Sequence, residues 1–105
     1  MLLGFISCRD KNEADSIGIH LLKHRLIACM QILDGVQSSY LWPPGKSTVD
    51  YADETLLLVK TLESKWREME KAVIKMHGYK NPEILAFPVS HASKKYLDWI
   101  IGELK

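Results

Sequence analysis

The longest hydrophobic pattern in the chain covers residues 26–61 and predicts one long β-hairpin. β-Favouring residues fill the stretch 26–42, Pro43-Pro44-Gly45 then favours a turn, and the chain returns in an apolar run that ends at Thr61. Extended over residues 26–42, a strand would span about 55 Å, whereas a compact chain of this length is roughly 35 Å across. We therefore expect the hairpin to bend sharply or to extend beyond its own subunit, where an exposed apolar ribbon would pair with other copies.

Asp34-Gly35 interrupts the first half of this hairpin, and two interpretations remain open. The Asp-Gly pair favours a tight two-residue turn between two short strands. A glycine in a strand pattern equally indicates a bulge that bends one long strand. The hydrophobic pattern alone does not distinguish the turn from the bulge.

Two short apolar runs and three helical patterns flank the hairpin. The runs 2–7 and 84–87 are typical of buried strands, and helices are expected over residues 10–24, 64–78 and 93–104. The apolar residues of each helical pattern recur on one side, as they do when a helix covers one face of a sheet. These inward stripes are Ala14, Ile17, Gly18 and Leu21; Trp66, Met69, Val73 and Met76; and Leu97, Ile100, Ile101 and Leu104.

Polar residues at the ends of the helical patterns indicate where each helix begins. Asp10 is expected to cap the first helix and to form a capping box with Glu13. Ser64 is expected to cap the second helix, which ends at Gly78, and Ser93 opens the third. The resulting order β-α-β-β-α-β, with an extra C-terminal helix, predicts an α+β fold of the ferredoxin-like type with an antiparallel sheet.

Composition and charge narrow the class of protein. The 105 residues are 47% hydrophobic and 26% charged, which is typical of an ordinary globular domain, and the net charge of +1 offers no footprint for nucleic acid. No apolar run approaches the ~18 residues that span a membrane, and the apolar start is too short for a signal peptide. Two cysteines do not make a disulfide framework, so we expect a cytoplasmic protein. From the charge and the short apolar runs we expect no nucleic-acid or membrane partner.

The densest polar cluster is the segment 77–83, between the second helical pattern and the last strand. Its His77, Tyr79 and Glu83 could support acid–base chemistry or hold a metal. Alternatively, the segment is a simple helix end, in which His77 faces the negative end of the helix dipole and Tyr79 packs. Glu83 opens an apolar strand directly after a proline, which aims its carboxylate at a defined place.

Other candidate ligands are two cysteines and a pair of histidines. Cys8 stands beside Arg9 at the start of a helix, an environment that lowers the pKa of a thiol, so it is a candidate for a soft metal or for oxidation. Cys29 fits a small buried hydrophobe in a strand. His20 and His24 have the i, i+4 spacing that can hold a divalent metal on a helix, although cationic side chains are favoured at that helix end in any case.

Motifs of catalysis and nucleotide binding are missing from the sequence. There is no G-x-S-x-G elbow, and Gly45-Lys46 follows prolines rather than opening a helix as in a P-loop. The aromatic residues Tyr40, Trp42 and Tyr51 near the hairpin tip have no basic surround that would favour stacking on bases. We therefore expect these rings to pack against a neighbouring subunit and the protein not to be an enzyme.

Several segments together resemble one known family. They are Ile27-Ala28-Cys29, Tyr40-Leu41-Trp42, Gly45-Lys46, Glu54 to Thr61, His77-Gly78-Tyr79-Lys80-Asn81-Pro82-Glu83-Ile84, Phe87-Pro88 and Tyr96-Leu97-Asp98-Trp99. Over roughly residues 4–101 this succession resembles the CutA divalent-cation tolerance proteins. The resemblance implies a single CutA-like domain over residues 1–105, a homotrimer assembled through the long hairpins, and a bulge at Asp34-Gly35.

The resemblance also implies a function. Family members are associated with tolerance to divalent cations and with copper binding, and no catalysed reaction is established for them. The implied metal ligands are His77 and Cys8, for copper or another divalent cation, with no tightly bound cofactor. A metal or a small ligand would bind in clefts between subunits, and the cleft residues would be Tyr79, Lys80, Glu83 and Trp42.

Three positions depart from the family pattern, and two other functions remain as alternatives. Gly78 stands where the family usually has proline, Lys80 where it often has an acidic or neutral residue, and Ile6 where some members have a copper-associated cysteine. The first alternative is a purely structural or signalling trimer that resembles the PII proteins and has no specific metal site. The second is an acylphosphatase-like hydrolase, which would need a phosphate-binding arginine after Gly35, and none follows before Arg67.

Overall fold

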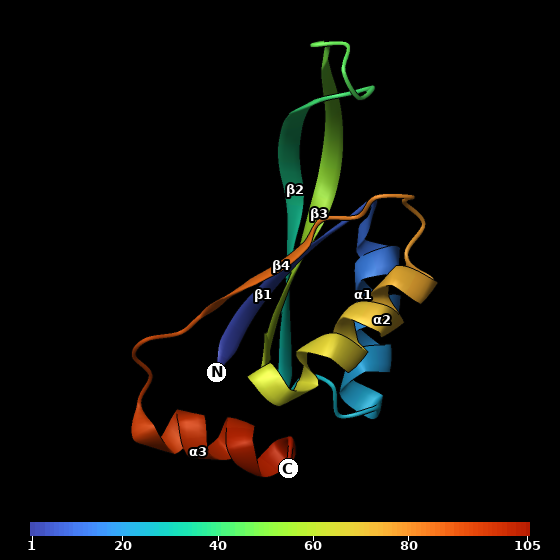
Figure 1. The fold of residues 1–105 in the computed structure, drawn as a ribbon. Coiled ribbons are helices and arrows are strands. Elements are labelled where there is room, and N and C mark those ends of the chain that lie inside the picture. The colour runs from blue at the N-terminus through green and yellow to red at the C-terminus, as the bar shows by residue number, and fades with distance from the viewer.

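The computed structural model describes all residues 1–105 and contains one four-stranded antiparallel sheet (Figure 1). The sheet order is β2-β3-β1-β4, which confirms the predicted α+β, ferredoxin-like fold. The C-terminal helix is present as an addition to that fold. The elements are β1 (Leu2–Cys8), α1 (Lys11–Lys23), β2 (Cys29–Leu41), β3 (Val49–Thr61), a 3₁₀ turn (Glu63–Lys65), α2 (Trp66–Met76), β4 (Ile84–Pro88) and α3 (Lys94–Glu103).

The β2–β3 hairpin projects beyond the rest of the subunit, as its length predicted (Figure 1). The two strands pair from Cys29 opposite Lys60 to Leu41 opposite Val49. The molecule is 46 Å long but only 26 and 24 Å in the other two directions. The prediction that the strand begins at Leu26 is wrong by a few residues, because Leu26 is buried in the connection between α1 and β2.

A bulge interrupts this pairing midway along β2. Leu33 pairs with Leu56, but the next pair joins Val36 to Glu54, so β2 holds one more residue than β3 at this point. Gly35 has a φ of +70°, a conformation that glycine adopts without the steric cost borne by other residues. The bulge interpretation of Asp34-Gly35 is therefore confirmed, and the alternative of a tight turn between two short strands is wrong.

The Asp34 side chain holds the bulge to the opposite strand. Its Oδ1 accepts hydrogen bonds from Thr55 Oγ1 at 2.7 Å and from the Gly35 backbone N–H at 3.0 Å. The bond from Thr55, followed by the bond from Gly35, lowers the pKa of the Asp34 carboxyl, since both stabilise its charged form. The carboxylate thus replaces the regular strand hydrogen bonding that the extra residue interrupts.

The hydrophobic core lies between the sheet and the two helices α1 and α2. Alternate residues of the strands point into it, and the helices contribute the stripes predicted from their spacing. Gly18 lets α1 lie close to the sheet, because a Cβ atom at this position would overlap Met30 Sδ. The fully buried large side chains include Ile6, Ile17, Leu21, Ile27, Leu57, Val59, Met69 and Val73.

The predicted start of α1 is confirmed, and that of α2 is wrong. The Asp10 carboxylate accepts the backbone N–H of Glu13 at 2.8 Å, whereas the Glu13 carboxylate accepts the N–H of Arg9, at 3.0 Å, rather than that of the cap residue. Ser64 lies inside the 3₁₀ turn, so α2 begins at Trp66 without a side-chain cap. In the stripe of α2, the last member, Met76, is 37% exposed because the helix ends there at the rim of the core.

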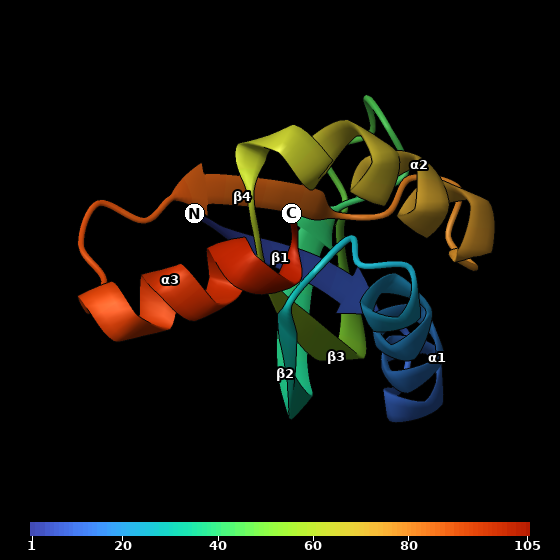
Figure 2. The same ribbon diagram turned by 90° about the horizontal axis from the view of Figure 1, so that it is seen from below.

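Helix α3 lies at the end of the sheet opposite the hairpin tip, apart from α1 and α2 (Figures 1 and 2). Ile100 and Leu104 are buried, as predicted, but Ile101 is 37% exposed because the helix contacts the body along a narrow strip. The Arg25 guanidinium binds Glu103 at the C-terminal end of α3, donating to its backbone oxygen at 2.8 Å and to its carboxylate at 3.0 Å.

The face of the sheet away from α1 and α2 carries exposed apolar side chains. Leu33, Leu85 and Phe87 are 53%, 43% and 47% exposed, and the strand neighbours of the first two, Ile32 and Ile84, pack against the core. Phe87 meets Phe5 on this face, with ring centroids 5.4 Å apart. Apolar groups gathered on a sheet face are typical of an interaction surface.

We predict that replacing Gly35 with alanine lowers the free energy of unfolding by about 1–2 kcal/mol, the cost of a left-handed conformation for a residue with a Cβ atom. No atom lies within 4 Å of the added methyl group, so the effect would come from the backbone alone. Urea unfolding measures the change. Gly102→Ala is the matched control, because that methyl group also enters open space but in a helix. An equal loss in both variants would contradict the prediction.

Candidate functional site

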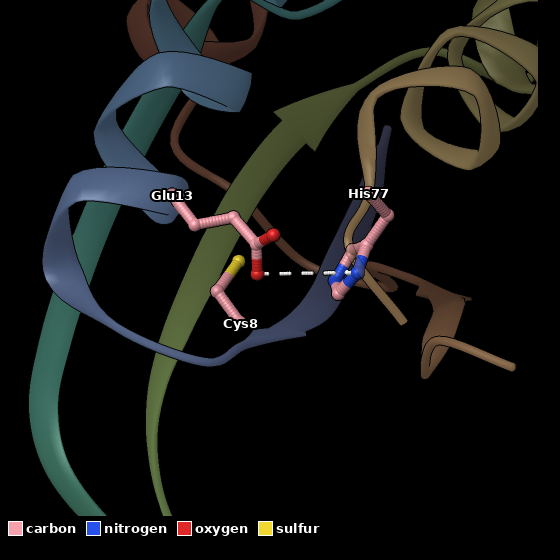
Figure 3. Close-up of side chains that lie close together, drawn as sticks. All are labelled: Cys8, Glu13 and His77. Carbon is pink, nitrogen blue, oxygen red and sulfur yellow. Dashed lines mark ion pairs between the residues drawn. The ribbon is translucent and has the colours of Figure 1, made fainter. Parts of the chain in front are cut away.

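Three potential metal ligands from two distant parts of the chain meet at one end of the core (Figure 3). Cys8 ends β1, Glu13 lies in the first turn of α1, and His77 follows α2 directly. Their sulfur, oxygen and nitrogen atoms all lie within 4.8 Å of one another. The structure thus brings together Cys8 and His77, which were candidate ligands from the sequence. It adds Glu13, which the sequence had indicated only as part of the capping box with Asp10. We call these residues the Cys8–Glu13–His77 cluster.

The carboxylate of Glu13 is held by two backbone amides. Its Oε1 accepts the N–H of Arg9 at 3.0 Å, and its Oε2 accepts the N–H of Gly78 at 2.9 Å. Only 6% of this side chain is exposed, so the two hydrogen bonds compensate for its burial. The carboxylate therefore joins the end of β1 and the start of α1 to the segment that follows α2.

Gly78 is required here by close approach rather than by a special backbone conformation. A Cβ atom at this position would lie 2.9 Å from Glu13 Oε2 and 2.9 Å from Arg9 Nη1. Proline, the residue expected here from the family resemblance, could not donate a backbone N–H to Glu13. The departure at Gly78 is thus matched to the position of the Glu13 side chain.

Both ring nitrogens of His77 take part in hydrogen bonds. Nε2 lies 2.7 Å from the Ser7 carbonyl oxygen, and Nδ1 lies 3.0 Å from the backbone N of Tyr79. A carbonyl only accepts and an amide only donates, so the proton lies on Nε2 and the lone pair on Nδ1. Nδ1 is also the nitrogen that faces Glu13, 3.9 Å from its Oε1 (Figure 3).

The Cys8 thiol is not activated by its surroundings. Burial, followed by the negative charges of Glu13, Asp10 and Glu54, raises the pKa of Cys8 to about 12. The expectation that Arg9 and the helix start would lower this pKa is wrong. The Arg9 side chain is 61% exposed and is directed to the Asp10 and Glu13 carboxylates, at 3.7 and 3.9 Å. The thiol is therefore protonated at neutral pH, and a metal bound here would have to replace that proton.

Tyr79 extends the cluster toward the hairpin. Its ring lies against His77 with centroids 4.9 Å apart, and the side chain is half-buried. Burial and the neighbouring Glu54 carboxylate raise the pKa of Tyr79 well above its ordinary value, so the phenol keeps its proton. Tyr79 is thus placed beside the cluster as a neutral hydrogen-bond donor.

The other residues predicted for a ligand cleft lie farther out. Lys80 and Glu83 are exposed in the connection between α2 and β4, where the Glu83 backbone oxygen accepts the N–H of Ser7 at 3.3 Å. Trp42 is at the hairpin tip, where its backbone N–H donates to the Thr48 carbonyl at 2.9 Å. Within one chain, the hairpin tip and the connection between α2 and β4 lie apart (Figure 1).

A polar cleft of about 350 Å³ lies between the start of α1 and the bulge of β2. Sequence patterns did not reveal this cleft, because the bulge brings together residues that are far apart in the chain. It is adjacent to the cluster, since Arg9 lines it and contacts Glu13. Its lining residues are Arg9, Asp10, Lys11, Asn12, Asp34, Gly35, Asp53, Glu54 and Thr55.

Comparison with known proteins agrees with the fold and with the resemblance. A family model described as CutA1 divalent ion tolerance protein matches residues 2–103. The divalent-cation tolerance protein CutA of Thermus thermophilus is 36% identical over 95 residues, which cover 90% of this chain and 89% of the relative. That of Pyrococcus horikoshii is 30% identical over 105 residues, which cover 100% and 99% of the two chains.

A solved structure, that of the periplasmic divalent cation tolerance protein CutA from Archaeoglobus fulgidus, has the same fold. The two structures superpose with a TM-score of 0.92 at 31% sequence identity, and the match covers 100% of both chains. No helix of the structure is long and apolar enough to cross a membrane. With a family model over nearly all residues and relatives of matching length, the chain belongs to the CutA1 divalent ion tolerance family.

Proposed function

We propose that this protein binds copper or another divalent cation at the Cys8–Glu13–His77 cluster and acts in divalent-cation tolerance. The observation that supports this is the meeting of a thiol, a carboxylate and an imidazole within 4.8 Å of one another. Thiol and imidazole ligands suit copper and zinc, whereas hard cations prefer oxygen alone. The names of the relatives from Thermus thermophilus and Pyrococcus horikoshii, both divalent-cation tolerance proteins, point to the same function.

Two of the three proposed ligands would have to give up a present partner. The metal would replace the proton of Cys8, and His77 Nδ1 would exchange the Tyr79 amide for the metal. Glu13 keeps one free lone pair on each carboxylate oxygen beyond its amide bonds, so it can bind without losing them. Only the short segment after α2 would then have to move.

We infer that the protein acts as a homotrimer, with no reaction of its own. The exposed apolar face of Leu33, Leu85 and Phe87, together with the projecting hairpin, supports association with other copies. In such an assembly the cleft residues Tyr79, Lys80, Glu83 and Trp42 would meet between subunits and hold a small ligand or a metal. His77 and Cys8 do not form a nucleophile and base, because both His77 nitrogens are engaged and the thiol is protonated.

We place the protein in the cytoplasm. Both cysteines, Cys8 and Cys29, are free thiols, which supports a reducing compartment. A periplasmic location, as described for the Archaeoglobus fulgidus relative, is the alternative. Fractionation of cells that express the full-length protein distinguishes the two.

We predict that the native mass corresponds to three subunits and persists on dilution, because obligate interfaces bury more than ~2,000 Å² of largely apolar surface. Replacing Trp42 with alanine should weaken assembly by ~2 kcal/mol if its ring is a hot spot between subunits. Analytical ultracentrifugation over a dilution series measures this. Ile74→Ala is the control, because Ile74 is 55% exposed on α2, on the helical side of the sheet. A stable monomer would contradict the proposal.

We predict that copper affinity falls at least about tenfold in Cys8→Ser and His77→Ala, since each removes one of three ligands. Copper titration followed by the ultraviolet absorption of the metal–thiolate bond measures this, and the band should be lost in Cys8→Ser. The control is His91→Ala, because His91 is exposed and remote in sequence from the cluster. Equal affinity in wild type and both cluster variants would leave a structural or signalling trimer as the function.

A further inference from the structure

Two histidines lie side by side at the C-terminal end of α1. The ring centroids of His20 and His24 are 4.1 Å apart and the ring planes are inclined by 31°. His24 is exposed and His20 is half-buried. From Glu13 to His20, the nearer of the two histidines, the helix rises about 10 Å, and the pair shares no residue with the Cys8–Glu13–His77 cluster.

The backbone holds one of these rings in the orientation that a metal ligand needs. His24 Nδ1 lies 2.9 Å from the His20 carbonyl oxygen, so this nitrogen carries the proton and donates it. The lone pair of His24 is consequently on Nε2, which is free. Metal-binding histidines are typically oriented in this way by a carbonyl on the other ring nitrogen. The ring nitrogens of His20 have no hydrogen-bond partner within the chain.

The two rings are close enough to share one ion, because their centroids are 4.1 Å apart and a metal holds each imidazole nitrogen at ~2.0–2.1 Å. Their planes are inclined by only 31°, so the in-plane lone pairs converge on one ion after rotation of a side chain. The partial negative charge at the end of α1 favours a cation there. Of the two nearby cationic side chains, Arg25 is paired with Glu103, which leaves Lys23 as the opposing charge.

We propose that His20 and His24 form a second, surface site for a borderline divalent ion such as Ni²⁺, Cu²⁺ or Zn²⁺, with water completing the coordination. Two imidazole nitrogens select these ions over Mg²⁺ and Ca²⁺, which require oxygen ligands. The site is separate from the metal site of the proposed function, because no ligand is common to the two. It also needs no partner subunit, since both ligands come from one helix.

Calorimetric titration of tag-free, full-length protein with Ni²⁺ tests this site. We expect His20→Ala and His24→Ala each to weaken binding at least about tenfold, because either change leaves a single imidazole without its chelate partner. Cys8→Ser should bind Ni²⁺ at this site as wild type does. His91→Ala is the matched control, because it removes the other exposed histidine and should leave the affinity unchanged. Wild-type affinity in both His20→Ala and His24→Ala would overturn the proposal.

Paramagnetic broadening by substoichiometric Cu²⁺ locates the ion independently. In nuclear magnetic resonance spectra of Cys8→Ser protein, the amide signals of residues 20–24 should broaden first, and this should disappear in His24→Ala. Far-UV circular dichroism confirms that each variant keeps its helices. Broadening restricted to the surroundings of His77 would overturn the surface site. The proposed function is tested separately in wild-type protein, where additional broadening around Cys8, Glu13 and His77 would support it and its absence would contradict it without affecting the surface site.

Discussion

The pairing of β2 with β3 is the constraint on which the rest of this structure depends. At its base the pair forms part of the sheet and helps to enclose the core, but beyond the bulge the two strands have only each other. A two-stranded ribbon is marginally stable in water by itself. The apolar side chains that it exposes, Leu41 at 69% and Tyr51 at 72%, increase this cost. The bulge at Asp34-Gly35 marks the division between the part of the hairpin supported by the core and the part that extends beyond it.

The Cys8–Glu13–His77 cluster and the packing of the helices are not independent of one another. The Glu13 carboxylate accepts hydrogen bonds from the backbone N–H groups of Arg9 and Gly78, and His77 Nε2 donates to the Ser7 carbonyl. The same side chains therefore close the core between β1, α1 and α2. A metal bound to these residues would act on the fold as a cross-link between three elements, because binding that requires the folded arrangement stabilises it.

Pattern and spacing predict the elements of this chain well because each is determined by local sequence. The helical stripes, the Asp10 cap and the over-long hairpin all follow from neighbouring residues. Ser64 failed as a cap because the chain first forms a 3₁₀ turn there, which no local residue type indicates. The pKa of Cys8 was predicted in the wrong direction because the fold buries the thiol and brings Glu13, Asp10 and Glu54 near it. Arg9, its neighbour in sequence, is largely exposed and is directed to the Asp10 and Glu13 carboxylates. The order of the strands creates these contacts, so spacing along the chain could not reveal them.

The cluster and the histidine pair would select metal ions on different physical grounds. A cation that reaches Cys8 must displace a proton from a buried thiol and break the bond between Tyr79 and His77, so only an ion with a strong preference for sulfur recovers that cost. At His24 the lone pair already faces solvent, and the carbonyl of His20 keeps it there. The surface pair would therefore bind weakly and would discriminate only between borderline and hard ions, whereas the buried cluster would select by softness. Because a whole subunit core closes around the cluster, its selectivity depends on the fold, while that of the surface pair depends on one helix.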